Sequence, residues 1–141
     1  MQQTDILLPV MALVFWTLCV LLLIPIQRFR AAFAKQVTVD DFKLGESANV
    51  PDNVRLPNRA YINLLEAPVL FYVLCFVVFT TETVNSAAVW VAWGYVALRM
   101  LHTLIHLTYN NVFHRLGVFA TSNAVLAVAW VGVFAGLVSG G

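Results

Sequence analysis

Two groups of polar residues interrupt otherwise apolar stretches of this sequence. In the first group, Arg59, Asn63 and Glu66 stand at positions i, i+4 and i+7, a spacing that places them on one face of a helix. Arginine binds carboxylates through paired hydrogen bonds, and a carboxylate receives an ammonium group. This group therefore indicates a site for a small zwitterionic or polyanionic molecule.

The second group has the same periodicity on a later apolar segment. Arg99, His102, Thr103 and His106 stand at i, i+3, i+4 and i+7, and Arg115 follows at the start of the next apolar segment. A charge within hydrocarbon costs at least about 2.5–3.5 kcal/mol, so these groups must be paired or hydrated. We expect the two faces to line one polar cavity that opens to the cytoplasm.

Two structural explanations compete with a binding site. Arg59 would also serve as an anchor that extends to the lipid headgroups. Glu66 and Arg99 would also satisfy each other as a buried ion pair that supports only the fold. Pro68 removes a helix hydrogen bond and frees the carbonyl of Leu64, which predicts a kink near Glu66.

The composition requires a membrane. Hydrophobic residues make up 61% of the chain and charged residues 11%, whereas a soluble chain carries about 25% charged residues. The net charge of +1 argues against a nucleic-acid partner, because no basic excess is present to neutralise phosphates. Cys19 and Cys75 both lie in apolar runs, and the sequence contains no disulfide framework or metal-ligand spacing.

Four apolar segments each have about the 20 residues that cross a hydrocarbon core. We expect them at about residues 6–26, 60–80, 86–107 and 116–138. They predict an all-α membrane protein in which residues 1–141 form a single domain, a bundle of four transmembrane helices. The first segment follows a leader without positive charge and is followed by "RFR", so we expect a retained helix and not a secretory signal.

The charges of the connections predict the orientation. The long connection, about residues 27–58, holds most of the Lys and Arg residues, and the third connection holds Arg115. By the positive-inside rule these two connections are cytoplasmic and both termini lie outside the cytoplasm. In the last segment, Gly132 and Gly136 have GxxxG spacing, which suits an oligomer contact but also fits ordinary membrane-helix composition.

These residues resemble the MAPEG family, the membrane-associated proteins in eicosanoid and glutathione metabolism. The first motif is "RAxxNxxE", formed by Arg59, Ala60, Asn63 and Glu66 and followed by a proline and Phe71. The second is "RMLHTLIHLTYNNVFHR", which contains the second polar group and Arg115. Together with the four segments and the long first connection, the resemblance covers essentially the whole chain.

The resemblance implies a homotrimer that binds glutathione between subunits near the cytoplasmic side. It implies that Arg59, Asn63 and Glu66 bind glutathione, with Glu66 facing the ammonium group, and that Arg99 and His102 support the pocket. Arg115 matches the arginine that stabilises the thiolate. A nearby cation favours this anion, since a free thiol has a pKa of about 8.5.

Three positions depart from the family pattern. Ile62 stands where several members have an arginine, Pro68 is one residue closer to Glu66 than usual, and His106 stands where a pocket tyrosine is expected. We place His106 with Arg115 in the catalytic group. The departures resemble bacterial members, so we expect a bacterial inner membrane protein.

The expected function is that of a glutathione transferase or peroxidase, in which the thiolate attacks a lipophilic electrophile or hydroperoxide from the bilayer. Three other functions stay open. The chain would also suit a non-enzymatic scaffold that binds lipid or a partner, or a haem or metal protein that uses His102 and His106. A proton relay or transporter through Glu66, Arg99 and the histidines is the third.

Overall fold

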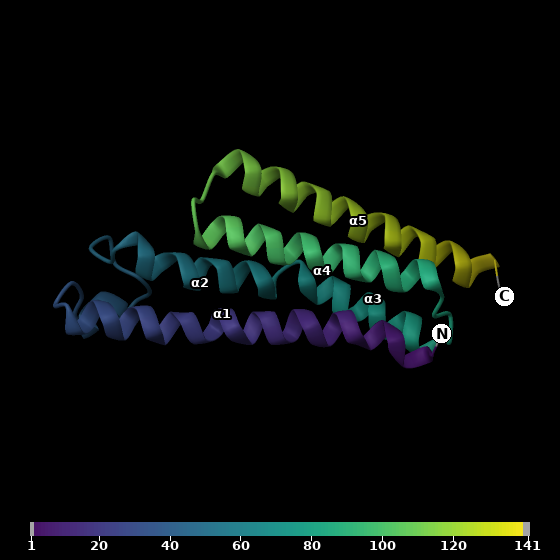
Figure 1. Cartoon of the computed structure of the whole chain (residues 1–141), viewed down its shortest axis with the longest axis horizontal. Helices are drawn as coiled ribbons and strands as arrows, with labels where there is room; N and C mark the ends of the chain where they lie inside the picture. The colour runs from purple at the N-terminus through teal and green to yellow at the C-terminus, as the bar shows by residue number, and fades with distance from the viewer. Residues whose placement is uncertain (1, 140–141) are drawn as a thin grey trace.

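Helices account for most of the structure, a computed structural model that describes residues 2–139 (Figure 1). In chain order the elements are η1 (Gln3–Ile6), α1 (Leu7–Phe33), η2 (Val39–Phe42), α2 (Asp52–Leu65), α3 (Pro68–Thr80), α4 (Ser86–Leu107) and α5 (Val112–Ser139). Four segments are long and apolar enough to cross a membrane: Gln3–Phe33, Asp52–Thr80, Ser86–Leu107 and Val112–Ser139. The prediction of an all-α protein with four transmembrane helices is confirmed, and residues 2–139 contain no strand.

Three of the expected spans are parts of longer helices. α1 continues to Phe33 instead of ending near Ile26, α2 begins at Asp52 instead of Ala60, and α5 begins at Val112. The 27 residues of α1 extend about 40 Å at 1.5 Å per residue, and a hydrocarbon core is about 30 Å thick. A helix of this length is longer than the hydrocarbon core is thick. The hydropathy of the sequence marks only the apolar part of each helix and misses its charged ends.

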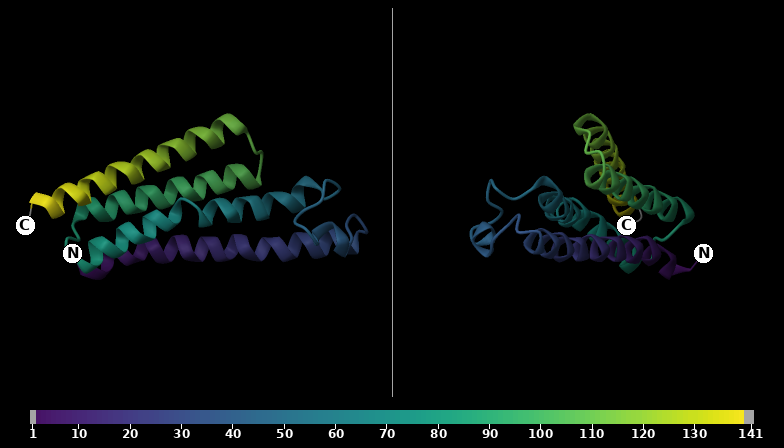
Figure 2. Two further views of the ribbon diagram at one scale, coloured as in Figure 1. Left: turned by 180° about the vertical axis from the view of Figure 1, so that it is seen from behind. Right: turned by 60° about the vertical axis from the view of Figure 1, so that its left-hand side comes forward.

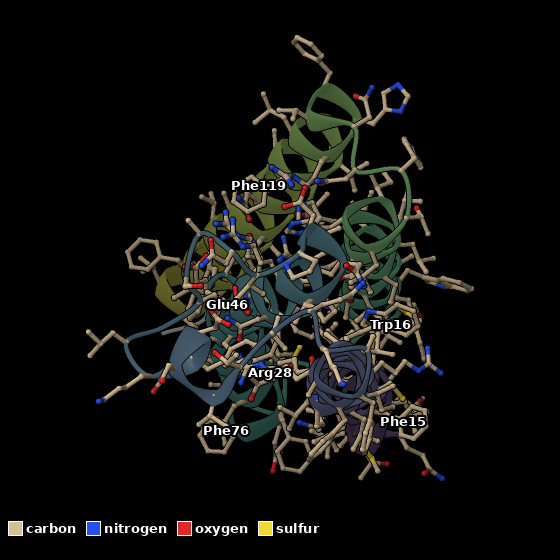
Figure 3. The ribbon with its side chains drawn as sticks, turned by 90° about the vertical axis from the view of Figure 1, so that its left-hand side faces the viewer. Phe15, Trp16, Arg28, Glu46, Phe76 and Phe119 are labelled. Atoms are coloured by element: carbon tan, nitrogen blue, oxygen red, sulfur yellow. The ribbon has the colours of Figure 1, made fainter. Side chains whose placement is uncertain are left out.

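α1 packs through one stripe of residues and leaves the rest for lipid. Its buried positions recur every three or four residues through most of the helix: Pro9, Leu13, Thr17, Val20, Ile24 and, farther on, Ala31. Thr17 satisfies its hydroxyl within the helix by donating to the carbonyl of Leu13 at 2.8 Å. In the end-on view, Phe15 of α1 and Phe76 of α3 point away from the bundle (Figure 3), with 70% and 64% of their surfaces exposed.

The connection between α1 and α2 is ordered around a small apolar cluster of its own. Ala31, Val37, Val50 and Val54 form this cluster, with Phe42 packed against it. Arg28 lies over the Phe42 ring at 4.7 Å and pairs with Glu46 at 3.5 Å. The connection is therefore a folded cap on this end of the bundle (Figure 3).

Asp41 stabilises this cap by accepting several hydrogen bonds within it. Its carboxylate accepts hydrogen bonds from the hydroxyl of Ser47 at 2.7 Å and from the amide and hydroxyl of Thr38 at 2.8 and 2.9 Å. These hydrogen bonds, that from Ser47 first, lower the pKa of the Asp41 carboxyl. Arg55 of α2 also donates to the carbonyl of Ser47, which connects the cap to the helix that enters the membrane.

The second membrane segment is broken in its middle. α2 ends at Leu65, α3 begins at Pro68, and Glu66 between them has a non-helical ψ of −93°. A proline has no amide hydrogen and its ring clashes with the preceding turn, so Pro68 begins a new helix and does not continue the old one. The predicted kink near Glu66 is thus a full break.

Figures 1 and 2 show how the helices are arranged around α4. α1 packs against α2, α3 and α4, whereas α5 packs mainly against α4 and also contacts α3. α5 leans away from α4 toward the end where the two helices are joined (Figures 1 and 2). Most of the surface of α5 is left for lipid or for another protein chain.

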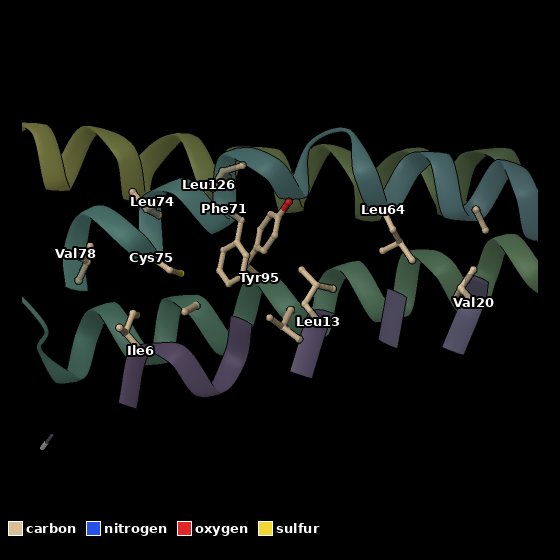
Figure 4. Close-up of a cluster of buried hydrophobic side chains, with 13 residues drawn as sticks. Ile6, Leu13, Val20, Leu64, Phe71, Leu74, Cys75, Val78, Tyr95 and Leu126 are labelled. Atoms are coloured by element: carbon tan, nitrogen blue, oxygen red, sulfur yellow. The ribbon is translucent and has the colours of Figure 1, made fainter. Parts of the chain in front are cut away.

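The core of the bundle centres on an aromatic pair. Phe71 of α3 and Tyr95 of α4 stack with ring centroids 4.6 Å apart and an angle of 21° between planes. Figure 4 shows this pair between Leu64 of α2 on one side and Cys75 and Val78 of α3 on the other. Aromatic pairs of this geometry add about 0.5–1.5 kcal/mol to the energy of their burial.

Candidate functional site

A polar cavity of about 850 Å³ lies at the end of the bundle where α5 diverges from α4. Its walls come from α2, from the last turns of α4 and from the first turns of α5. Five of the seven residues that the sequence predicts for the site line it: Arg59, Asn63, His102, His106 and Arg115. The fold therefore brings both predicted polar groups to one space.

The α2 wall supplies arginines and an amide. Arg55 and Arg59 both line the cavity, and Arg59 is exposed. Asn63 is half-buried, and its side-chain NH₂ group donates to the carbonyl of Arg59 at 3.0 Å, which leaves its side-chain oxygen available as an acceptor. Because Asp52 is the one acidic residue in the lining, this wall favours an anionic ligand.

The α4 wall consists of two buried histidines. His102 and His106 stand one turn apart, each with 3% of its surface exposed, and their rings meet edge to face at 6.1 Å. The ring of Phe119 packs against His102 at 5.7 Å. Nδ1 of His106 is buried and has no hydrogen-bond partner among the described residues.

The α4–α5 junction positions Arg115. Its Nη1 donates to Oδ1 of Asn110 at 2.7 Å. α4 ends at Leu107, and beyond it Asn110 has a left-handed backbone with a φ of 45°. The backbone amide of Asn110 donates back to the carbonyl of Ile105 at 2.8 Å. Asn111 then caps α5 by accepting from the amide of His114 at 3.0 Å.

Arg99 lies behind the cavity and not in its lining. Its side chain is 0% exposed, its Nη2 donates to the backbone carbonyl of Asn63 at 2.7 Å, and its guanidinium lies 5.6 Å from the ring centre of Phe119. The carbonyl of Asn63 would accept from the amide of residue 67 in a continuous helix, and the break at Pro68 leaves it free. Arg99 thus caps the broken end of α2.

Glu66 lies outside the cavity lining. It is exposed at the break. Within residues 2–139 the one ion pair is Arg28–Glu46, so the alternative of a buried Glu66–Arg99 pair is wrong for the single chain. The physical reason is the break itself, because it offers Arg99 a backbone acceptor and leaves Glu66 exposed.

The sequence does not identify several residues that shape the cavity. Arg55 was assigned to the connection, yet it lies in α2 and lines the cavity. Asn110 and Phe119 also line it; Asn110 contacts Arg115, and Phe119 contacts both His102 and Arg99. The pair Asn110–Asn111 is a recognisable turn signal, whereas nothing in the sequence distinguishes Phe119 from other apolar residues of α5.

The histidines have few partners for metal binding. Among the described residues, no three His, Cys, Asp or Glu side chains lie close enough to hold a metal ion. His102 and His106 therefore form a two-residue set at most, next to arginines. The surrounding cations disfavour a further cation at this position.

Comparison with known proteins gives one finding. The model of the MAPEG family matches residues 6–135, which is nearly the whole chain. Neither the curated proteins nor the solved structures that were compared with the chain gave a match.

Proposed function

The chain belongs to the MAPEG family, and from this premise we propose that its polar cavity binds glutathione for attack on lipophilic substrates. Members of the family generally use glutathione, and membership supports a membrane function of the transferase, peroxidase or a related type. The observation that carries the specific proposal is that Arg59, Asn63, His102, His106 and Arg115 line one cavity.

The chemistry of glutathione complements the cavity. Glutathione carries two carboxylates, one ammonium group and one thiol. Arg55 and Arg59 offer paired donors to the carboxylates, and Asn63 offers an amide oxygen. Arg99 supports the wall from behind by holding the end of α2, and His102 contributes from α4.

The reacting group is the thiol, which we place beside Arg115. A guanidinium near the sulfur lowers the pKa of the thiol and favours the thiolate. We assign to His106, which lines the cavity, the role of accepting the proton that the thiol loses. With an electrophile, the sulfur then forms a bond to carbon and the leaving group departs with its electron pair. With a hydroperoxide, the sulfur bonds to the terminal oxygen, the O–O bond breaks, and the alkoxide leaves and takes up a proton to become an alcohol. The thiol of a second glutathione then attacks the sulfenic acid so formed, which gives the disulfide and water.

We propose a homotrimer in which a neighbouring chain completes the site. Arg59 and Glu66 are exposed in the single chain although they belong to the membrane segment Asp52–Thr80. An uncompensated charge at such a position costs at least about 2.5–3.5 kcal/mol. A second copy against α2, with glutathione between the two, would give Glu66 the ammonium group as a partner.

The orientation follows from the charges. With the α1–α2 and α4–α5 connections in the cytoplasm, the cavity opens to the cytoplasm, where glutathione is abundant, and both termini lie outside. We place the protein in a bacterial inner membrane. A substrate that dissolves in the bilayer would then enter between helices.

A second candidate function is that of a non-enzymatic member that binds lipid or a partner. It is favoured by two residues in the cavity lining, Ile62 and His106, which replace an arginine and a tyrosine of the family pattern. Isothermal calorimetry on the purified protein in detergent separates the two functions. No binding of glutathione at millimolar concentration refutes the enzymatic proposal.

Arg115→Ala tests the role assigned to the cation. We expect this variant to lose the ultraviolet absorbance of bound thiolate while it keeps the size of the wild-type oligomer. Arg30→Ala is the matched control, because Arg30 is an exposed arginine of α1 outside the cavity lining. An unchanged thiolate signal in Arg115→Ala would contradict the assignment.

A further inference from the structure

The folded cap between α1 and α2 carries apolar side chains on its outside as well as in its interior. Its interior is the apolar cluster that includes the buried residues Val37 and Val54. Val39 and Leu44 of the same cap have 89% and 98% of their surfaces exposed, and Phe33 at the end of α1 has 86%. Single apolar residues are ordinary on a protein surface, whereas several within one short connection indicate a surface that binds an apolar partner.

Leu44 is held outward by a fixed backbone. The carboxylate of Asp41 accepts from the amide of Thr38 and the hydroxyl of Ser47, and the amide of Ser47 donates to the carbonyl of Asp41 at 2.8 Å. These bonds close residues 38–47 into a compact loop. Within this loop Gly45 has a φ of 95°, a conformation that glycine adopts without strain. A side chain presented by a fixed turn loses little conformational freedom when it binds.

The cap lies at the level of the lipid headgroups. A hydrocarbon core of about 30 Å takes about 20 helical residues, which from Leu7 reach Ile26. Arg28 and Arg30 follow directly, and Phe33 ends α1 about 10 Å beyond the hydrocarbon. The headgroup layer is about 5–8 Å thick on each side of a bilayer. Because the cap extends to one side of α1 and α2 at this level (Figures 2 and 3), it lies along the membrane surface.

A lysine stands close in sequence to two of these apolar side chains. Lys43 directly precedes Leu44, and Lys35 follows Phe33 by two residues. Both lysines are exposed, and neither forms an ion pair with another residue of the range 2–139. At a membrane surface, a lysine lays its methylene stem along apolar groups and extends its ammonium group to lipid phosphates.

Most acidic groups of the cap are engaged within it. Asp41 accepts the hydrogen bonds described above, and Glu46 pairs with Arg28. The exposed charged side chains of residues 30–44 are therefore Arg30, Lys35 and Lys43 against Asp40. The outside of the cap thus combines apolar groups with a positive charge, which complements a layer of phosphates.

We propose that the cap docks on the phospholipid headgroup layer of the bilayer that holds the protein. Phe33, Val39 and Leu44 insert among the headgroups, and Lys35 and Lys43 contact lipid phosphates. Arg55 of α2 donates to the carbonyl of Ser47 in the cap, so the docked cap fixes the depth at which α2 enters the membrane. A second copy of the chain is the competing occupant, but two copies that meet through this surface would bring like charges together.

Cysteine labelling at position 44 tests the proposal and does not depend on glutathione. Leu44→Cys and Ala48→Cys are placed in nanodiscs of phosphatidylcholine and phosphatidylglycerol and treated with a polyethylene glycol maleimide, with gel shift as the readout. Ala48 is the matched control, because it is an exposed residue of the same cap between two polar residues, Ser47 and Asn49. We expect position 44 to react at least about tenfold more slowly than position 48.

Two measurements complete this labelling experiment. The wild type gives the background from the native cysteines, Cys19 and Cys75, and labelling in sodium dodecyl sulfate compares the reactivity of the two new thiols in unfolded protein. Equal rates at positions 44 and 48 in nanodiscs would overturn the proposal.

Quenching by lipid distinguishes a bilayer from a second copy. Leu44→Trp and Ala48→Trp are placed in nanodiscs whose phosphatidylcholine is brominated near the headgroup, and the fluorescence of the four native tryptophans is subtracted with the wild type. We expect the added fluorescence to be quenched in Leu44→Trp and to persist in Ala48→Trp. Slow labelling at position 44 without quenching would overturn the proposal in favour of a second copy.

Charge reversal tests the contact with phosphates. Lys43→Glu in the Leu44→Cys protein should speed labelling about fivefold, because a basic residue near an anionic surface contributes to docking. The new carboxylate by itself disfavours the reactive thiolate and would slow labelling, so its direct effect has the opposite sign. Asp40→Asn is the matched control at an exposed acidic residue and should not speed labelling. No rise in Lys43→Glu, or an equal rise in both variants, would overturn the contact.

Discussion

Asn110 is the residue through which the fold places Arg115, and its replacement tests whether this placement matters. The backbone of Asn110 has a φ of 45°, a conformation that glycine adopts without cost. Asn110→Gly therefore removes the acceptor of the 2.7 Å hydrogen bond to Arg115 without straining the junction. Asn110→Asp keeps the acceptor and adds a negative charge at the same point.

The expected effect of Asn110→Gly on glutathione binding follows from the strength of the hydrogen bond between Arg115 and Asn110. A hydrogen bond to a charged group contributes about 1.5–3 kcal/mol when buried, and partial exposure of Arg115 reduces this to about 1 kcal/mol. Without its anchor, Arg115 must be ordered by the ligand, at a cost of about 0.5–1.5 kcal/mol. We expect Asn110→Gly to weaken glutathione binding about two- to tenfold.

The second effect is larger and has a different cause. A carboxylate at position 110 would pair with the Arg115 guanidinium and offset the charge that the thiolate needs. We expect Asn110→Asp to weaken glutathione binding more than tenfold and to raise the pKa of the bound thiol, because an anion near the sulfur disfavours the thiolate. We therefore expect glutathione to bind most tightly to the wild type, less tightly to Asn110→Gly and least tightly to Asn110→Asp.

Calorimetry measures the affinities, and the ultraviolet absorbance of the thiolate against pH measures the pKa of the bound thiol. Thermal unfolding followed by circular dichroism checks that both variants are folded. Wild-type affinity in both variants would show that Asn110 does not position Arg115. Tighter binding by Asn110→Asp than by Asn110→Gly would show that Arg115 does not face the anionic part of the ligand.

Two further predictions concern stability. Phe71→Ala removes half of the buried stack with Tyr95 and should cost about 3–5 kcal/mol in thermal or detergent-induced unfolding, whereas Phe76→Ala at an exposed position should cost much less. Because its pKa is lowered in the folded state, Asp41 stabilises the α1–α2 connection above its ordinary pKa of 3.8, and this contribution is lost as the pH falls below that value. Limited proteolysis at decreasing pH should show this loss in the wild type, and Asp41→Asn should be cleaved equally at every pH.

Hydropathy was sufficient to predict the membrane segments. Each segment is almost uniformly apolar, so the signal is strong and independent of packing. The helix ends could not be predicted in this way, because hydropathy reports apolar residues, whereas the first turns of α2 contain the polar residues Asp52 and Arg55. The folded structure of the α1–α2 connection could not be predicted from the sequence either, because Val37, Val50 and Val54, which form its apolar cluster, are far apart along the chain.

Helical periodicity was sufficient to group most of the site. The spacing from Arg59 to Asn63 and from His102 to His106 placed each pair on one face, and both faces line the same cavity. The exception is Glu66, because periodicity assumes a continuous helix and the break at Pro68 ends that continuity. The sequence predicts a kink at Pro68 and not a full break. The break is stabilised by the hydrogen bond from Arg99 to the freed carbonyl of Asn63, and this contact depends on the packing of α4 against α2.

The bond between Arg99 and the carbonyl of Asn63 also has a consequence for biogenesis. The two residues are 36 positions apart in the chain, and the arginine lies in the later membrane segment. A protein made from its N-terminus onward inserts the broken α2–α3 segment while the end of α2 is still uncapped. That segment reaches its final geometry only after α4 has been synthesised and packed against it, so the two segments mature in the bilayer as one cooperative unit.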